Sequence, residues 1–203
     1  EEEEVLDNTL IFYISDNGAP YKKFKTDAPG NGAGWNGSLN DPMNGEKGTL
    51  IEGGIHVPYV ISWKGVLPEG ITYDKPISTL DVAATTVDLA ELSDKSKLDG
   101  VNLIPYLTGV DNTSPHESLT WRWESQNAIR KGDWKLIVNG EDEYLYNLDI
   151  DISETNNLIN QNPIIASELK TDLTEWSQSL TPRGLYTTPP SAASKGFFEF
   201  YFD

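Results

Sequence analysis

Two short apolar runs frame a long polar segment in the first third of the chain. Residues 9–15 form an unbroken run rich in β-branched and aromatic side chains, and residues 57–63 form a second run. The first run ends at the turn signal Asp16–Gly18 and predicts a buried strand of a parallel or mixed sheet. The second run predicts another strand. Residues 19–54 between them are rich in Gly, Asn, Asp and Pro, and so long a loop between two strands favours a functional role.

Apolar positions spaced three to four residues apart predict two helices. The first begins near Ser78 and extends to about Leu92. The second covers residues 164–180, with Asn162 as a cap and Pro163 in the first turn. Its apolar side chains fall on one face: Ile165, Leu169, Leu173, Trp176 and Leu180.

Four strand candidates follow one another closely between the two helices. They cover residues 117–123, 127–131, 134–138 and 144–148. Their quick succession predicts an antiparallel meander, which the helix at 164–180 would cover. We therefore predict an α/β fold with three regions: an α/β domain at 1–110, a small antiparallel sheet with its helix at 111–180, and a tail at 181–203. The aromatic end of the tail predicts either a docked edge strand or a junction to another module.

Charge and composition narrow the classes of function. The 203 residues include 32 Asp and Glu but 15 Lys and Arg, which gives a formal net charge of −17. Such a charge argues against nucleic acid or an anionic membrane as the main partner. No apolar stretch approaches the ~20 residues of a membrane span. The chain has no cysteine, which excludes disulfides, thiolate zinc sites and cysteine nucleophiles.

Asp16 and Asn17 are candidate metal ligands because they follow the first predicted strand. Ligands of open α/β sheets bind beyond the carboxyl ends of the strands. Carboxylate and amide oxygens suit Ca²⁺ or Mg²⁺. The alternative is that Asp-Asn-Gly only forms a turn.

Lys47 is a candidate anion ligand because it lies in the glycine-rich sequence Gly45-Glu46-Lys47-Gly48. Neighbouring glycines leave room for an anion to approach its ammonium group, and Gly53 and Gly54 permit a tight backbone path into the next strand. The alternative is a lysine that is simply solvated.

Together these two motifs resemble the C-terminal half of type I sulfatases, the formylglycine-dependent, calcium-containing members of the alkaline-phosphatase superfamily. The pattern is a strand ending in Ser-Asp-Asn-Gly, followed about thirty residues later by Gly-x-Lys-Gly-Thr-x-x-Glu-Gly-Gly-x-x-Val-Pro. Further matches follow in order at residues 77–85, 98–109, 128–137 and 144–158. The resemblance covers about residues 5–180. It implies part of the mixed sheet of an alkaline-phosphatase-like sulfatase domain, followed by the small sheet and helix.

The resemblance implies roles for three residues. Asp16 and Asn17 would bind the active-site Ca²⁺, and Lys47 would contact the sulfate as a catalytic residue. The family's nucleophile arises from a Cys/Ser-x-Pro-x-Arg motif that is absent from this sequence. We therefore expect the chain to be the C-terminal portion of a sulfatase whose missing N-terminal portion carries the formylglycine. The chain alone would be inactive. No signal peptide is present in it, and the resemblance implies a bacterial periplasmic or secreted enzyme.

A sulfated polysaccharide or oligosaccharide is the expected substrate. Trp35, in the long loop, and Trp121 and Arg122, in the first strand of the meander, could contact the sugar; the alternative for the latter two is packing of the small sheet. His56 is either structural or a sugar contact. His116, before a strand, is expected at the surface. Two other functions stay open: a phosphodiester or phosphonate hydrolase of the same superfamily, and a non-catalytic carbohydrate-binding module.

Overall fold

The computed structural model describes residues 5–20, 39–92, 97–182, 184 and 189–202. The chain divides into two compact units that interleave along the sequence. The first contains the chain up to Ser15 together with Pro58–Leu119, and the second contains Asp16–Val57 and the chain from Thr120 onward. The division expected from the sequence, at residues 110 and 180, stays a prediction.

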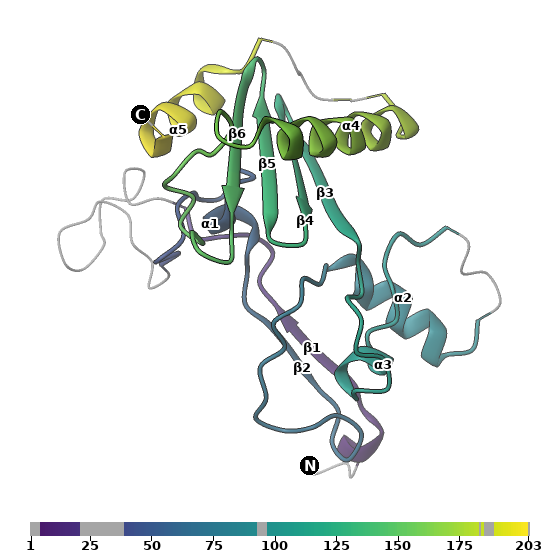
Figure 1. Ribbon diagram of the computed structural model, residues 1–203. Coiled ribbons are helices and arrows are strands. Elements are labelled where there is room, and N and C mark those ends of the chain that lie inside the picture. The colour runs from purple at the N-terminus through teal and green to yellow at the C-terminus, as the bar shows by residue number, and fades with distance from the viewer. Residues whose placement is uncertain (1–4, 21–38, 93–96, 183, 185–188, 203) are drawn as a thin grey trace. The chain divides into compact units, whose positions relative to one another are not determined.

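A two-stranded sheet forms the centre of the first unit. Strands β1 (Ile11–Ile14) and β2 (Tyr59–Ser62) pair antiparallel (Figure 1), and Tyr13 lies opposite Val60. Both strands were predicted, but the expected burial of β1 is wrong for one face. Within the described residues Tyr13 is 71% exposed and Val60 55% exposed. An unbroken apolar run is typical of a strand covered on both faces, and the described chain covers only one.

Helices and a buried carboxylate complete the first unit. It contains the 3₁₀ turn η1 (Leu6–Asn8), the predicted helix α2 (Leu80–Leu89) and the short α3 (Ile104–Leu107). Asp81 is fully buried and accepts hydrogen bonds from the amides of Ser78 and Val101. His116 Nε2 lies 2.9 Å from Asp81 Oδ1. The expectation that His116 is a surface residue is therefore wrong: its side chain is 10% exposed, because it pairs with this carboxylate.

A four-stranded antiparallel sheet organises the second unit. Its strands follow in chain order: β3 (Ser118–Trp123), β4 (Gln126–Lys131), β5 (Trp134–Asn139) and β6 (Asp142–Asn147). Ala128 lies opposite Ile137, and Ile137 opposite Tyr144. The predicted meander is confirmed.

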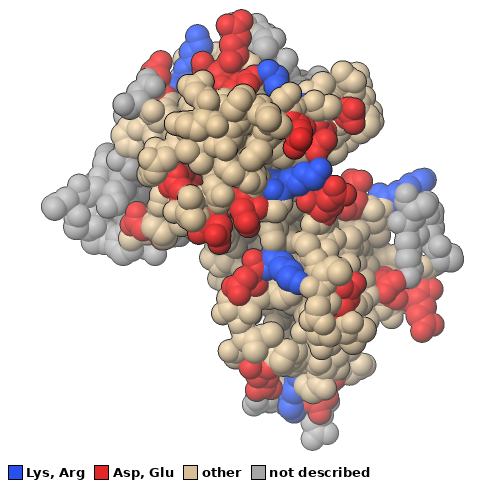
Figure 2. Space-filling view, in the orientation of Figure 1, with Lys and Arg blue, Asp and Glu red and all other residues tan. Residues whose placement is uncertain are grey.

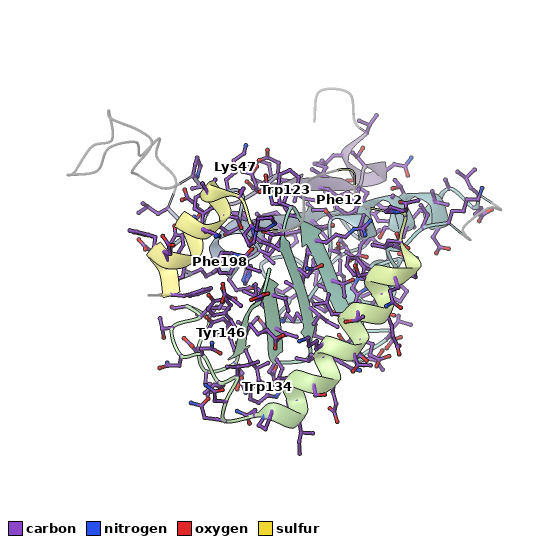
Figure 3. All side chains as sticks on the ribbon, turned by 90° about the horizontal axis from the view of Figure 1, so that it is seen from above. Phe12, Lys47, Trp123, Trp134, Tyr146 and Phe198 are labelled. Carbon is purple, nitrogen blue, oxygen red and sulfur yellow. The ribbon has the colours of Figure 1, made fainter. Side chains whose placement is uncertain are left out.

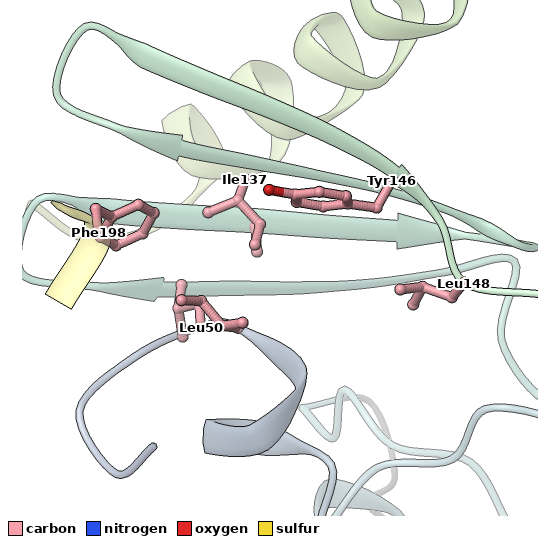
Figure 4. Packing of buried hydrophobic residues seen from close by; sticks show 7 residues of the cluster. Leu50, Ile137, Tyr146, Leu148 and Phe198 are labelled. Atoms are coloured by element: carbon pink, nitrogen blue, oxygen red, sulfur yellow. The ribbon is translucent and has the colours of Figure 1, made fainter. Parts of the chain in front are cut away.

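Both faces of this sheet are covered, because successive side chains of each strand point to opposite sides. Helix α4 (Pro163–Ser179) crosses one face of the sheet (Figure 1). It buries Leu169 and Leu173 against Ile129, Leu136 and Leu145. The covering helix is thus confirmed. On the other face, Leu50 and Ile51 pack with residues of the sheet and of the C-terminal helix (Figure 4): Ala128, Ile137, Tyr146, Leu148 and Phe198.

The aromatic tail forms a helix, α5 (Ala192–Phe202), and not the edge strand that was one alternative. Phe198 and Phe202 lie one helical turn apart and pack against Tyr144 of β6 at ring-centre distances of 5.5 and 4.6 Å. Side chains four residues apart lie on the same face of a helix. A helix therefore brings both rings against the sheet, and this packing favours a helix over the strand that the run of aromatic residues also allows. No described helix is both long and apolar enough to cross a membrane.

Candidate functional site

The segment after β1 packs tightly onto the glycine-rich segment that carries Lys47. The amide of Gly18 donates a hydrogen bond to the carbonyl of Gly54 at 3.0 Å. A Cβ atom on Gly18 would lie 1.7 Å from the carbonyl oxygen of Gly53, so only glycine fits there. A Cβ atom on Gly53 would lie 2.4 Å from the carbonyl oxygen of Asn44. Three stretches of backbone, at Gly18, Asn44 and Gly53, are thus in direct contact.

Asn40 ties two of these stretches together through its side chain. Its amide nitrogen donates to the carbonyl of Ala19 at 2.8 Å and to the carbonyl of Gly45 at 3.0 Å, while its oxygen accepts from the amide of Ala19 at 2.8 Å. The residues just after Asp16 and Asn17 are therefore fixed to the residues just before Lys47.

Lys47 lies in the middle of a tight turn. The amide of Thr49 donates to the carbonyl of Glu46 at 3.0 Å, and the Thr49 hydroxyl donates to the same carbonyl at 2.8 Å. Gly48, the next residue of the turn, has a φ of +96°, a value that favours glycine. The turn exposes Lys47, as Figure 3 shows on the side of the unit that carries α5. Within the described residues its ammonium group has no ion-pair partner.

Asp16 and Asn17 offer the right donor chemistry for Ca²⁺ but not a full ligand set. Asp16 is exposed, and the amide nitrogen of Asn17 donates to the carbonyl of Gly18 at 3.1 Å. A metal ion would bind the carboxylate oxygens of Asp16 and the amide oxygen of Asn17, since an amide nitrogen is not a ligand for Ca²⁺. Ca²⁺ takes about six to eight oxygen ligands. Among the described residues no three acidic or histidine side chains gather as a metal site. These residues can therefore contribute two ligands, and the others must come from elsewhere.

A cluster of three buried ionisable side chains lies beneath the glycine-rich segment. Lys135 of β5 is fully buried, and its Nζ atom lies 2.7 Å from Glu52 Oε1 and 2.9 Å from Glu154 Oε1. Glu52 belongs to the single-turn helix α1 (Glu52–Ile55) that contains the glycine pair. The Glu52 amide donates to Glu154 Oε2 at 2.5 Å. Three segments thus meet at one ammonium group.

The two carboxylates of this cluster differ in acidity. Burial alone would raise the pKa of Glu52, but Lys135 and His56 outweigh it and lower that pKa to about 2. For Glu154, burial prevails over the opposing effect of Lys135 and raises the pKa to about 7. Burial alone would lower the pKa of Lys135, but Glu154 and Glu52 raise it. One lysine therefore faces one firmly ionised carboxylate and one that holds a proton near neutral pH.

Three of the four residues predicted to contact a sugar lie within the described part of the chain. His56 Nδ1 lies 2.9 Å from Glu52 Oε2, with half of the histidine side chain exposed. Trp121 packs against the core that contains Leu50, and Arg122 donates to the carbonyl of Thr181 at 2.6 Å. Trp35 lies outside the described residues. A sugar-binding role for these four residues stays a prediction.

Sequence reasoning missed Asn40, Lys135 and Gln126, the last of which contacts both Gly48 and Leu50. Lys135 did carry a signal. It lies in an apolar strand at a core-facing position, two residues before Ile137, and a buried lysine requires carboxylate partners. Gln126 carried none, because its partners are 76 and 78 positions away.

Comparison with known proteins identifies relatives of the chain. The sulfatase family profile matches residues 1–92. An uncharacterized sulfatase of Escherichia coli K12, YdeN, is 36% identical over 150 residues, which are 70% of this chain and 24% of YdeN. The chain thus spans about a quarter of the length of this curated relative.

Solved structures share the fold over nearly the whole chain. Ps i-CgsB, also solved in complex with k-i-k-neocarrahexaose, is 26% identical with a TM-score of 0.75, covering 98% of this chain and 42% of its own. The phosphonate monoester hydrolase of Agrobacterium radiobacter has a TM-score of 0.58 at 21% identity, covering 88% of this chain and 37% of its own, and shows the fold alone. The predicted fold class is confirmed. Profile, relatives and fold agree, and the chain belongs to the sulfatase family.

Proposed function

We propose that the chain supplies part of the active site of a sulfuric ester hydrolase. The observation that carries this proposal is the local construction around Lys47: an exposed lysine on a tight turn, fixed by backbone contact and by Asn40 to the segment that carries Asp16 and Asn17. Catalytic groups must be held to within about an ångström to be effective. A lysine that was merely solvated would not need such support.

Lys47 acts on the sulfate group in this proposal. Its ammonium contacts a sulfate oxygen and stabilises the negative charge that develops there and on the leaving oxygen as the sulfur–oxygen bond breaks. Asp16 and Asn17 hold a Ca²⁺ ion through their side-chain oxygens. When bound, that ion supplies further positive charge to the sulfate. Because no described group pairs with Lys47, its charge is available to the substrate.

The nucleophile comes from a second portion of the enzyme in this proposal. The sequence has no Cys/Ser-x-Pro-x-Arg motif from which a formylglycine could form. We call this chain together with that portion, and with the remaining calcium ligands, the complete enzyme. Without the second portion, this chain binds no substrate productively and is inactive. The enzyme acts in the periplasm or outside the cell.

We propose a sulfated carbohydrate as the substrate. Support comes from Ps i-CgsB, whose structure with an oligosaccharide matches almost all of this chain. Half-exposed His56 directly follows α1, close in sequence to Lys47, and could contact a sugar hydroxyl. The surface itself gives little help, because Asp and Glu side chains are spread over the face shown in Figure 2. A sulfated polymer must therefore be held by the local charge at Lys47 and the metal.

A phosphodiester or phosphonate hydrolase is the second candidate, favoured by the shared fold of the phosphonate monoester hydrolase. A non-catalytic carbohydrate-binding module is the third. It predicts sugar binding by the 203-residue chain alone and without calcium.

Hydrolysis rates of the complete enzyme on an aryl sulfate and on the matching aryl phosphate and phosphonate esters test the proposal. We expect the sulfate ester to be cleaved fastest. Faster cleavage of a phosphorus ester would favour the second candidate, and oligosaccharide binding by the chain alone in a chelator would favour the third. A denaturing intact mass of the purified protein must accompany the assay, since a single species of 22.5 kDa means that this chain alone is present.

A further inference from the structure

One face of the four-stranded sheet directs polar side chains at the segment that carries Lys47. Ala128 of β4 and Ile137 of β5 lie opposite each other and contribute to the core that contains Leu50 and Ile51. Side chains two residues away in a strand point to the same face. Gln126, two residues before Ala128, and Lys135, two residues before Ile137, therefore face the same segment.

Gln126 holds the backbone on the C-terminal side of Lys47 at two points. Its Nε2 atom donates to the carbonyl of Gly48 at 3.0 Å, and its Oε1 atom accepts from the amide of Leu50 at 2.9 Å. Gln126 is only 1% exposed, so water cannot replace it easily. A single amide that bonds both a carbonyl and an amide two residues apart fixes the orientation of both peptide groups.

Lys135 holds the same segment at its far end. It pairs with Glu52, five residues after Lys47, and with Glu154, which in turn accepts the amide hydrogen of Glu52. The segment from the turn to α1 is thus attached to β4 at one end and to β5 at the other. Breaking the second attachment leaves unpaired buried charges, which destabilises the fold as a whole.

The first attachment is the one that bears on Lys47. Gly48 follows Lys47 directly, and Gln126 bonds its carbonyl. On the other side of the turn, a Cβ atom on Gly48 would meet the ring of Phe197 of α5 at 3.6 Å. The Lys47 ammonium has no ion-pair partner among the residues that the structure describes, so the structure fixes the backbone from which the side chain extends and no contact of the ammonium group itself.

We propose that Gln126 is a positioning residue for Lys47: it fixes the turn from which the lysine reaches the sulfate. This inference rests on the proposed function, in which Lys47 acts on the substrate. It assigns the small sheet a role in the reaction although no side chain of that sheet needs to contact the reacting atoms.

The first test measures the attachment without any catalysis. Gln126→Met keeps the length of the side chain but removes both hydrogen bonds, and Gln161→Met changes an exposed glutamine as the control. Hydrogen–deuterium exchange in the full chain should become at least about tenfold faster at the Leu50 amide in Gln126→Met, and stay unchanged in Gln161→Met. Unchanged exchange at Leu50 would overturn the inference.

The second test is a double-mutant cycle in the complete enzyme. Gln126→Met should lower kcat by about 10- to 100-fold, yet have little further effect in a Lys47→Ala background, because the residue that it positions is gone. An equal loss in both backgrounds would mean a merely structural role. If Lys47→Ala itself kept the wild-type rate, the proposed function would fail, while the exchange experiment would still report on the attachment.

Gln126→Glu separates the two hydrogen bonds of this side chain. Its carboxylate still accepts from the Leu50 amide but sets an oxygen against the Gly48 carbonyl in place of a donor. We expect protection at Leu50 to be kept and kcat to fall about as far as in Gln126→Met, because the Gly48 peptide directly follows Lys47. A wild-type kcat, with Leu50 still protected, would contradict the role of the Gly48 contact.

Discussion

The two sheets of the chain differ in how their faces are covered. The four-stranded sheet has α4 on one face and the Leu50 core with α5 on the other, so that Leu136 and Ile137 are both fully buried. The two-stranded sheet leaves Ile11, Tyr13 and Val60 exposed within the described residues. The burial of apolar surface is the main source of folding free energy. The second unit therefore contains its own apolar core, whereas the first holds the buried carboxylate of Asp81, which accepts hydrogen bonds from the amides of Ser78 and Val101.

This difference matters for the candidate site, because its three proposed residues, Asp16, Asn17 and Lys47, all belong to the second unit. The segment that carries Lys47 is held by the sheet of this unit, through Gln126 and Lys135. Changes in that sheet should therefore affect stability strongly, and changes on the exposed face of the two-stranded sheet should not.

The largest effect is expected at the buried lysine. Lys135→Met should lower the free energy of unfolding by about 3–5 kcal/mol, because Glu52 and Glu154 would be left buried without a cation. Urea unfolding of the full chain measures this loss. Lys131→Met is the control: Lys131 pairs with Asp172, both side chains are about two-fifths exposed, and its loss should cost at most about 1 kcal/mol. Equal losses in the two variants would contradict the buried cluster.

A matched pair of isoleucines compares the two sheets directly. Ile137 is fully buried and Ile11 is 43% exposed. Ile137→Ala should cost about 2–5 kcal/mol by creating a cavity, while Ile11→Ala should stay within about 0.5 kcal/mol. Chemical denaturation of both variants tests the contrast. A large loss in Ile11→Ala would show that the exposed face is covered in solution.

A third effect is expected from pH. The pKa of Glu154 rises from 4.5 to about 7 on folding, so the folded state binds this proton more tightly. The stabilisation from this proton is fully present below pH 4.5. It declines by up to about 1.4 kcal/mol per pH unit as the pH rises from 4.5, and it is lost as the pH rises through 7. The Glu154 carboxyl group interacts electrostatically with three titratable neighbours: Lys135, Glu52 and Tyr146. Glu52 titrates far below this window, and Lys135 and Tyr146 far above it.

Glu154→Gln is the variant that isolates this proton. Glutamine mimics the protonated carboxyl group, so the decline in stability between pH 5 and 7 should flatten. Unfolding free energies at several pH values in that range provide the measurement. A decline that persists in Glu154→Gln would assign the pH dependence to another group.

Local patterns in the sequence were sufficient for much of the fold. The strands of the meander and helix α4 came from periodicity, because each buries a regular stripe of side chains such as Leu169 and Leu173. Helix α1 was missed, since Gly53 and Gly54 carry no helical propensity and are set by backbone contacts with Asn44 and Gly18. Helix α5 was missed because a run of aromatic residues is also compatible with a strand. The packing of Phe198 and Phe202 against Tyr144, which favours the helix, cannot be read from the local sequence.

The candidate site was predictable in its residues but not in its support. Asp16, Asn17 and Lys47 belong to recognisable motifs, which can be identified from a few neighbouring residues. Gln126, Lys135 and Glu154 lie between 76 and 102 positions from the groups that they hold. Such pairings depend on the register of the sheet and on which face each side chain takes, which local propensity does not determine.

The release of inorganic sulfate by the complete enzyme tests the central claim most directly. Lys47→Ala should reduce the rate on an aryl sulfate by at least about 100-fold, because the charge that stabilises the transition state is lost. Lys97→Ala, which changes an exposed lysine of the other unit, should retain the wild-type rate. A Lys47→Ala enzyme that releases sulfate as fast as the wild type would contradict the account.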